Sequence, residues 1–143
     1  ASLALGDLDA EAAAETARRC QHLRPTLRAS SFRVDVADVG SVQEFAGHVL
    51  VFFRSAGATR LDILVNNAGC HGVGAIDSTD DETFERTWDR ALNVNLRGQA
   101  RMVRAFLRLG MLAGDGPGER SEAATELAQL PRYSSVVNIA STE

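Results

Sequence analysis

The feature that most constrains the fold is a regular alternation of short apolar runs with amphipathic segments of helical period. Strands are expected at residues 2–5, 31–34, 61–65 and 135–140, and helices at residues 9–23, 41–53 and 88–109. Strands that alternate with helices form parallel sheets joined by right-handed crossovers. The sequence therefore predicts an α/β fold with a doubly wound parallel sheet.

The helix ends and the most apolar strand have local signals. Pro25 cannot continue the first helix, and Ser41 is a plausible N-cap for the second. Residues 79–87 are expected to form a lead-in turn to the third helix. Residues 61–65 are almost uninterrupted apolar residues, a pattern typical of a strand buried on both faces of a parallel sheet.

One segment departs from the alternation. Gly114, Gly116, Pro117 and Gly118 interrupt the pattern, a short helix fits residues 119–130, and Pro131 would end it. We interpret residues 111–132 as an insertion. The chain is then one partial domain spanning residues 1–143, with this insertion near its end.

Composition excludes several classes of partner. Hydrophobic residues make up 45% of the 143 and charged residues 24%, a balance that suits a single globular core. The net charge of −4 contains no basic block for nucleic acid or an anionic membrane, and no apolar run approaches the roughly 20 residues of a membrane span. Cys20 and Cys70 have neither disulfide nor metal-ligand spacing, so no metal is expected and a cytoplasmic location fits best. All 15 basic residues are arginine.

Polar residues follow the predicted strands where each one ends. Asp7, Asp35, Asn67 and Ser141 occupy such positions. In open parallel sheets, ligands bind beyond the carboxyl ends of the strands. These residues therefore predict a ligand site at one edge of the sheet.

The two aspartates suggest a nucleotide. Asp7 could accept hydrogen bonds from both hydroxyls of an adenosine ribose and would repel a 2′-phosphate, which favours NAD over NADP. Alternatively, Asp7 and Asp9 only begin a helix whose dipole attracts anions. Asp35 and the Val36 amide could bind an adenine edge, or Asp35 could be an ordinary turn residue.

Residues 66–69, Asn-Asn-Ala-Gly, form the most specific motif. Small residues let the backbone approach a flat ligand, although a plain turn after a strand would have the same composition. Preceded by Asp62-Ile63-Leu64-Val65, the stretch resembles the Asn-Asn-Ala-Gly motif of the short-chain dehydrogenase/reductase family, a Rossmann-like fold. The matching order of further motifs strengthens the resemblance over nearly the whole chain outside residues 111–132.

The resemblance implies roles for individual residues. Asp7 and Leu8 match the cofactor-selecting position, Asp35 and Val36 the adenine-contacting pair, and Asn67, Ala68 and Gly69 the cofactor-binding turn. Asn95 matches the helix asparagine that holds a water in the proton relay, and Ser141 the catalytic serine. A core-facing amide and an ordinary strand-end hydroxyl are the alternatives for Asn95 and Ser141.

Three other residues are not expected to act in the site. Cys70 and His71 follow the turn, but adjacent side chains diverge, so a metal site is not expected. Tyr133 comes before Ser141, whereas the family's tyrosine comes after its serine. We interpret Tyr133 as a packing residue.

Some of the family's machinery does not fall within residues 1–143. The glycine-rich turn that binds pyrophosphate at a helix N-terminus would precede Asp7, and the tyrosine and lysine of the acid/base pair would follow Glu143. We expect the chain to be the middle of a longer enzyme and not to turn over by itself. The family's first strand would lie between the strands at residues 2–5 and 61–65, and without it both strands would lack a ladder partner. We therefore expect the real polypeptide to include this strand or, as the alternative, the two strands to pair directly by rearrangement.

The resemblance implies an NAD-dependent oxidoreductase that transfers a hydride between the nicotinamide and a carbonyl or secondary alcohol, with NADP as the less favoured cofactor. The expected partners are this small-molecule substrate and further copies of the chain, as a dimer or tetramer through the helix at residues 88–109. Arg97, Arg101, Arg104 and Arg108 line the polar side of that helix, which could equally be a solvated face. The alternative function is a non-catalytic nucleotide-binding or regulatory relative. A receiver or flavodoxin-like domain is not supported, because the sequence contains no acidic cluster or phosphate loop.

Overall fold

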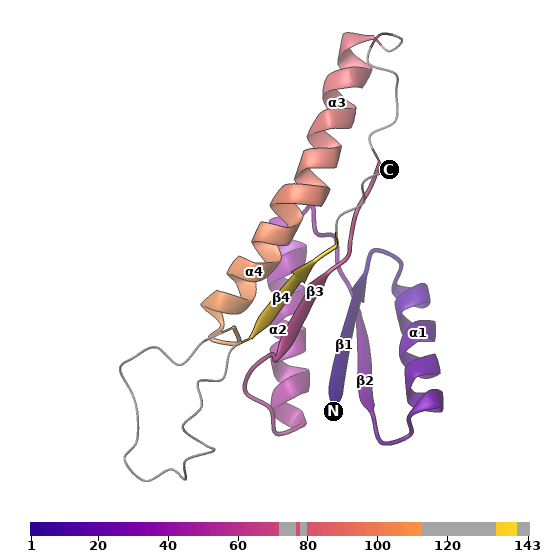
Figure 1. Ribbon diagram of the computed structural model, residues 1–143, viewed down its shortest axis with the longest axis vertical. Coiled ribbons are helices and arrows are strands. Elements are labelled where there is room, and N and C mark those ends of the chain that lie inside the picture. Colours follow the sequence, from indigo (N-terminus) through magenta and orange to yellow (C-terminus); the bar gives the residue numbers. More distant parts are fainter. Residues whose placement is uncertain (72–76, 78–79, 113–133, 140–143) are drawn as a thin grey trace.

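A computed structural model describes residues 1–71, 77, 80–112 and 134–139, and it confirms the alternation of strands and helices (Figure 1). The elements are β1 (Ser2–Asp7), α1 (Ala10–Leu23), β2 (Arg28–Arg33), α2 (Val39–Ser55), β3 (Ile63–Asn66), α3 (Asp81–Leu92), the π-helical segment η1 (Asn93–Gly98), α4 (Gln99–Arg108) and β4 (Ser135–Asn138). The proposed short helix at residues 119–130 lies outside the described residues, as does the insertion from residue 113 onward.

The strands form two parallel pairs rather than one continuous sheet. In the first pair Ser2 of β1 lies opposite Arg28 of β2, and in the second Ile63 of β3 lies opposite Ser135 of β4. No hydrogen-bond ladder joins β1 to β3 in the described part of the chain. A cavity of about 510 Å³ instead separates them, lined by both strands and by side chains of α1, α2 and α4. The alternative in which these two strands pair directly is therefore wrong.

The core lies where α2 and α4 pack against each other and against the strands. The rings of Phe45 and Phe106 meet edge to face with centroids 6.2 Å apart, and Figure 1 shows α2 running behind the strands. Met111 is completely buried; its N–H donates to Phe106 O at 2.9 Å, and its carbonyl accepts from Leu61 N at 2.9 Å. Met111 and Leu112, the first residues of the segment interpreted as an insertion, belong to the core, and Met111 connects the end of α4 to Leu61 just before β3.

Two helix starts also differ from the prediction. Asp38, not Ser41, caps α2: its carboxylate accepts from Ser41 N at 2.6 Å, while the Ser41 hydroxyl accepts from Asp35 N at 2.9 Å. The expected lead-in turn at residues 79–87 is helical from Asp81 onward, because Asp80 caps α3 by accepting from Thr83 N at 2.9 Å. In both places the N-cap is an aspartate: Asp38 for α2 and Asp80 for α3.

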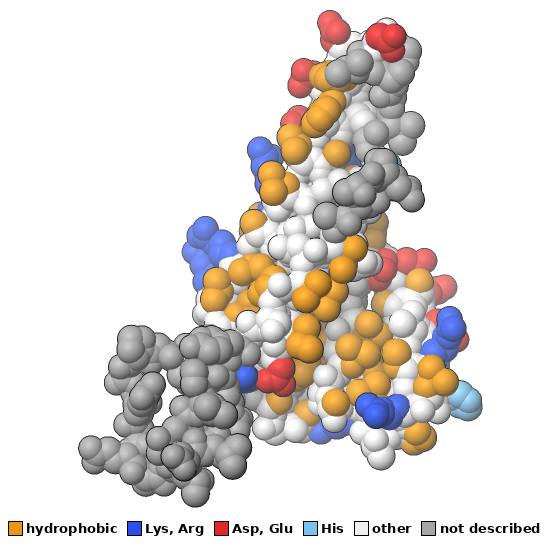
Figure 2. Space-filling model, in the orientation of Figure 1, with side chains coloured by type: hydrophobic (Ala, Val, Ile, Leu, Met, Phe, Trp, Pro, Cys, Tyr) orange, Lys and Arg blue, Asp and Glu red, His pale blue; other side chains and the backbone are white. Residues whose placement is uncertain are grey.

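Strand β3 is not buried on both faces, contrary to the sequence pattern. Leu64 is buried, but Ile63 and Val65 remain 63% and 54% exposed. The reason is tertiary: α4 contacts one face of β3, and no described helix covers the other. Figure 2 shows hydrophobic side chains gathered over the strands on the face in view.

Helices α3, η1 and α4 run on as one rod (Figure 1). The α4 end is anchored in the core by Met102 and Phe106, whereas α3 contains no buried residue. The rod therefore projects beyond the sheet and carries η1 at the level of the strand ends. Among the described residues, none of the helices is both long and apolar enough to span a bilayer.

Candidate functional site

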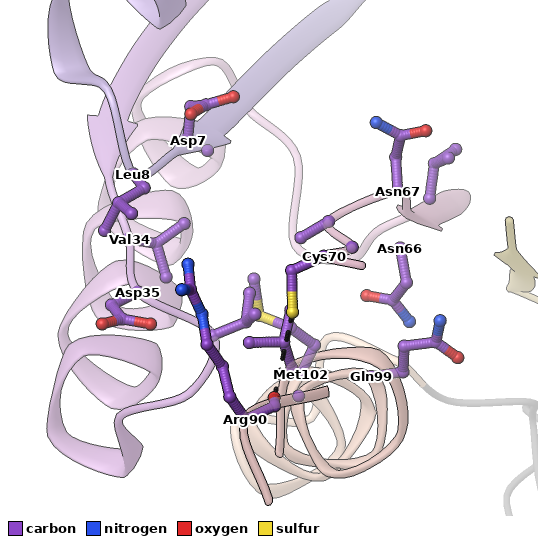
Figure 3. Close-up of a pocket in the computed structure, with 17 residues that line it drawn as sticks. Asp7, Leu8, Val34, Asp35, Asn66, Asn67, Cys70, Arg90, Gln99 and Met102 are labelled. Atoms are coloured by element: carbon purple, nitrogen blue, oxygen red, sulfur yellow. Dashed lines mark hydrogen bonds between the residues drawn. The ribbon is translucent and has the colours of Figure 1, made fainter. Parts of the chain in front are cut away.

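A cleft of about 400 Å³ opens where β1, β2 and β3 end, and helix residues of the α3–α4 rod form its remaining wall. Figure 3 shows Asp7, Leu8 and Asp35 on one side, Asn66 and Asn67 on the other, and Arg90, Gln99 and Met102 from the rod. The lining includes every residue that the sequence assigned to cofactor binding: Asp7, Leu8, Asp35, Val36, Asn67, Ala68 and Gly69. Asp7 and Gly69, 62 residues apart in the chain, therefore meet at one edge.

Asp7 and Asp9 have separate tasks. Asp9 is the N-cap of α1 and accepts from the Glu11 and Ala12 amides at 3.0 Å each. Asp7 accepts from Asp9 N at 2.9 Å through Oδ1 only, which leaves its second oxygen available in the cleft. Asp9 is thus the N-cap of α1, while Asp7 both accepts from the residue that begins the helix and lines the cleft.

The loop after β2 presents both a carboxylate and an amide. Asp35 Oδ1 accepts from Ala37 N at 2.9 Å, so the side chain is fixed while Oδ2 keeps its lone pairs. No acceptor for the Val36 N–H occurs within the described residues. The two groups form an acceptor and a donor next to each other on the cleft wall.

The Asn-Asn-Ala-Gly turn is fixed at its first residue and open at its last. Asn66 is buried, and its Nδ2 donates to Asn138 Oδ1 at 2.9 Å across the β3–β4 pair. At Gly69, a methyl group would make only ordinary contacts, 3.6 Å from Asn95 Oδ1, and its φ is not positive. Neither backbone conformation nor internal packing requires glycine there, so its small size leaves space that belongs to the cleft.

Asn95 does not line the cleft; it holds the turn that does. Its Oδ1 accepts from Cys70 N at 2.8 Å, and its Nδ2 donates to Cys70 O at 2.8 Å. The alternative of a core-facing amide is wrong, because Asn95 is exposed within η1, and π-helical segments occur often at functional sites. One N–H and one lone pair of this amide remain for a further ligand.

Sequence reasoning missed the contribution of the rod. Arg90, Val94 and Gly98 line the cleft at intervals of four residues, and Gln99 and Met102 extend this wall. Helical spacing counted from Asn95 could have identified this face. Arg90 has no carboxylate partner in the part of the chain that the structure describes, and it lines the cleft together with Asp35 and Cys70 (Figure 3).

The sequence also drew attention to Cys70, His71, Ser141 and Tyr133. Cys70 lines the cleft and its thiol lies 3.9 Å from Arg90 O, whereas His71 is exposed and is not among the lining residues. Within the described ranges no cluster of three or more His, Cys, Asp or Glu is placed to bind a metal. Ser141 and Tyr133 lie outside these ranges.

Residues 1–119 match the short chain dehydrogenase family. The chain is 38% identical over 120 residues to short chain dehydrogenase mpl6 of Monascus purpureus, covering 80% of this chain and 37% of that protein. It is 37% identical over 105 residues to an indene-carboxyl-CoA reductase of Mycobacterium tuberculosis, covering 73% of this chain and 33% of the reductase.

Solved structures agree with the sequence relatives. An alcohol dehydrogenase of Thermococcus sibiricus with bound 5-hydroxy-NADP has a TM-score of 0.61 and 27% identity, over 75% of this chain and 41% of that one. A short chain dehydrogenase/reductase of Burkholderia phymatum in complex with NAD has a TM-score of 0.61 and 27% identity, over 76% of this chain and 34% of that one. The chain thus spans between a third and about two fifths of the length of these relatives. Its incomplete Rossmann-like α/β fold and the family match agree, and the chain belongs to the short chain dehydrogenase family.

Proposed function

We propose that the gene product containing this chain is a nicotinamide-dependent oxidoreductase that interconverts a carbonyl and a secondary alcohol. The observation that carries the proposal is the convergence of Asp7, the Asp35–Val36 pair and the turn at residues 67–69 on one cleft at the strand ends. Relatives that share the fold bind NAD or NADP in their solved structures.

The cleft fits the adenosine half of such a cofactor. The available oxygen of Asp7 can accept from ribose hydroxyls, Asp35 Oδ2 can accept from the exocyclic amine of adenine, and the Val36 N–H can donate to a ring nitrogen. The open space at Gly69 admits the cofactor close to the backbone. A bound nicotinamide would supply the hydride acceptor or donor.

The protein groups would position the reactants and move the proton. By family resemblance, Ser141 orients the substrate oxygen through a hydrogen bond, and Asn95 holds a water that returns the proton to solvent. The reciprocal pair with Cys70 supports this role for Asn95, because it fixes the amide and the cofactor turn in one rigid arrangement. The helical segments η1 and α4 expose Leu96 and Leu107, which supports self-association of the protein.

Cys20 and Cys70 are free thiols, which suits a location in the reducing cytoplasm.

Within this proposal we assign NAD as the preferred cofactor, because the Asp7 carboxylate would repel a 2′-phosphate. The experiment measures oxidation or reduction of NAD(H) and NADP(H) by the complete gene product against a panel of alcohols and carbonyls. Asp7→Asn should raise the KM for NAD about tenfold, the effect of losing a charge-assisted hydrogen bond, and should lower the KM for NADP.

The matched control is Asp9→Asn, which removes a neighbouring charge but keeps a good helix cap, and it should leave both constants unchanged. A wild-type KM lower for NADP than for NAD would contradict the role of Asp7. Nucleotide binding without any turnover would contradict the oxidoreductase itself.

A further inference from the structure

Residues of the α3–α4 rod donate hydrogen bonds to the backbone of the loop that carries Asp35 and Val36. Arg101 Nη1 of α4 lies 3.0 Å from Ala37 O, 3.3 Å from Val36 O and 3.4 Å from Asn93 O. One nitrogen has two hydrogens, so the guanidinium shares them among three carbonyls. Asn93 Nδ2 adds a second donor to Ala37 O at 3.2 Å.

These contacts fix two successive peptide planes at both ends. In the plane joining Val36 to Ala37, the carbonyl accepts from Arg101 and the N–H donates to Asp35 Oδ1 at 2.9 Å. In the plane joining Ala37 to Asp38, the carbonyl accepts from Arg101 and Asn93 while the N–H donates to Asp35 O at 3.1 Å. The N–H groups of these two peptides donate to the carboxylate and the carbonyl of Asp35, and their carbonyls accept from Arg101. The orientation of the Asp35 carboxylate therefore depends on the contacts of Arg101.

Hydrogen bonds from the charged guanidinium of Arg101 are stronger than those from a neutral donor would be. Arg101 is part-buried and has no ion-pair partner among the residues that the structure describes, so carbonyl oxygens alone solvate its charge on this side. Asn93 Oδ1 is buried without a hydrogen-bond partner in the same part of the chain, so Asn93 contributes to the contact only as a donor.

We propose that Arg101, assisted by Asn93, is a positioning residue that orients the Asp35–Val36 edge and thereby sets the affinity for the adenine end of the cofactor. The proposal rests on the proposed function, because it assumes that this edge binds adenine. Arg101 is not one of the residues that line the cleft; it lines a separate pocket with Val39 and Val42 of α2. It acts through the backbone and is not expected to change the hydride-transfer step.

The test compares Arg101→Met and Arg101→Lys in the complete gene product, with AMP and nicotinamide mononucleotide as separate probes in titration calorimetry. Arg101→Met should weaken AMP about tenfold, the loss of one hydrogen bond from a charged donor, and should raise the KM for the dinucleotide with kcat unchanged. Nicotinamide mononucleotide should bind as in the wild type. Arg101→Lys should recover most of the AMP affinity, because an ammonium can still donate to the same carbonyls.

Arg104→Met is the matched control: it lies one helical turn further along α4, is exposed, and should leave AMP binding unchanged. Unaltered AMP binding in Arg101→Met, or an equal loss for both probes without recovery in Arg101→Lys, would overturn the positioning role. If Arg101→Met does not fold, Asn93→Leu decides by the same criterion, since it should weaken AMP about threefold without affecting nicotinamide mononucleotide. A wild type that binds neither AMP nor dinucleotide would refute the proposed function, and the positioning role with it.

Discussion

Two helical glycines of this chain have opposite surroundings. A methyl group on Gly98 of η1 would lie 2.9 Å from Val36 Cγ2, 3.0 Å from Val36 Cβ and 3.3 Å from Val36 O. A methyl group on Gly47 of α2 would meet nothing within 4 Å. The first glycine permits the rod to approach the loop that carries Asp35 and Val36, whereas the second only weakens its helix.

We therefore predict stability changes of opposite sign. Gly98→Ala should destabilise the protein by about 1–3 kcal/mol, because the overlap with the Val36 side chain and the tight contact with its carbonyl outweigh the gain in helix propensity. Gly47→Ala, its matched control, should stabilise by about 0.5–1 kcal/mol. Urea unfolding of the two variants measures both, and a stabilised Gly98→Ala protein would show that η1 does not press on this loop.

At the scale of the element, α3 depends on local interactions because it buries no residue. Its cap is Asp80, which accepts from the Thr83 amide at 2.9 Å. The backbone hydrogen bond from Thr83, followed by a side-chain hydrogen bond from the same residue, lowers the pKa of Asp80 below its ordinary value of 3.8. The carboxylate thus stabilises the folded helix above the unfolded pKa, and this contribution is lost as the pH falls through the lowered value.

The pH response of α3 should follow from that sign. The Thr83 amide resonance should shift as the pH falls below about 4, while the start of α3 loses helical order. In Asp80→Asn the cap accepts without titrating, so the Thr83 resonance should stay constant over the same window. The same pH dependence in both proteins would mean that another group controls this helix end.

At the scale of the whole molecule, the cavity between β1 and β3 determines which apolar residues are covered. Ile63 and Val65 line it and are largely exposed, although their sequence pattern is that of a fully buried strand. Two strands with a third between them lie about 10 Å apart, since neighbouring strands are about 4.8 Å apart. We predict that one further strand fills this cavity in the complete gene product.

We predict that Ile63→Thr lowers the free energy of unfolding by different amounts in the 143-residue chain and in the complete gene product. In the 143-residue chain it should change the free energy of unfolding by less than about 0.5 kcal/mol, because Ile63 is 63% exposed. In the complete gene product, a filled cavity would bury Ile63, and the cost should rise to about 1–3 kcal/mol. Leu64→Ala, buried on the α4 side in this chain, should cost about 2–5 kcal/mol in both. Equal costs of Ile63→Thr in the two proteins would show that nothing fills the cavity.

Local sequence determined the elements and most of the site. Apolar period alone located the strands and helices, because the side-chain spacing of each is set by backbone geometry. It also put Asp7, Asp35 and Asn67 at strand ends, and parallel strands bring such ends to one edge. The residue types of the Asp35–Val36 pair and of the turn at residues 66–69 indicated a ligand before any family was considered, family resemblance added Leu8, and all of these residues line the cleft.

Tertiary structure alone decided what depends on distant partners. The burial of Met111 and the exposure of Ile63 follow from which surfaces pack together, which local pattern does not encode. The pairing of Asn95 with Cys70, 25 residues apart, and the contact of Arg101 with Ala37, 64 residues apart, arise because the rod crosses the strand ends. Such contacts between segments far apart in the chain form only when the packed core has brought them together.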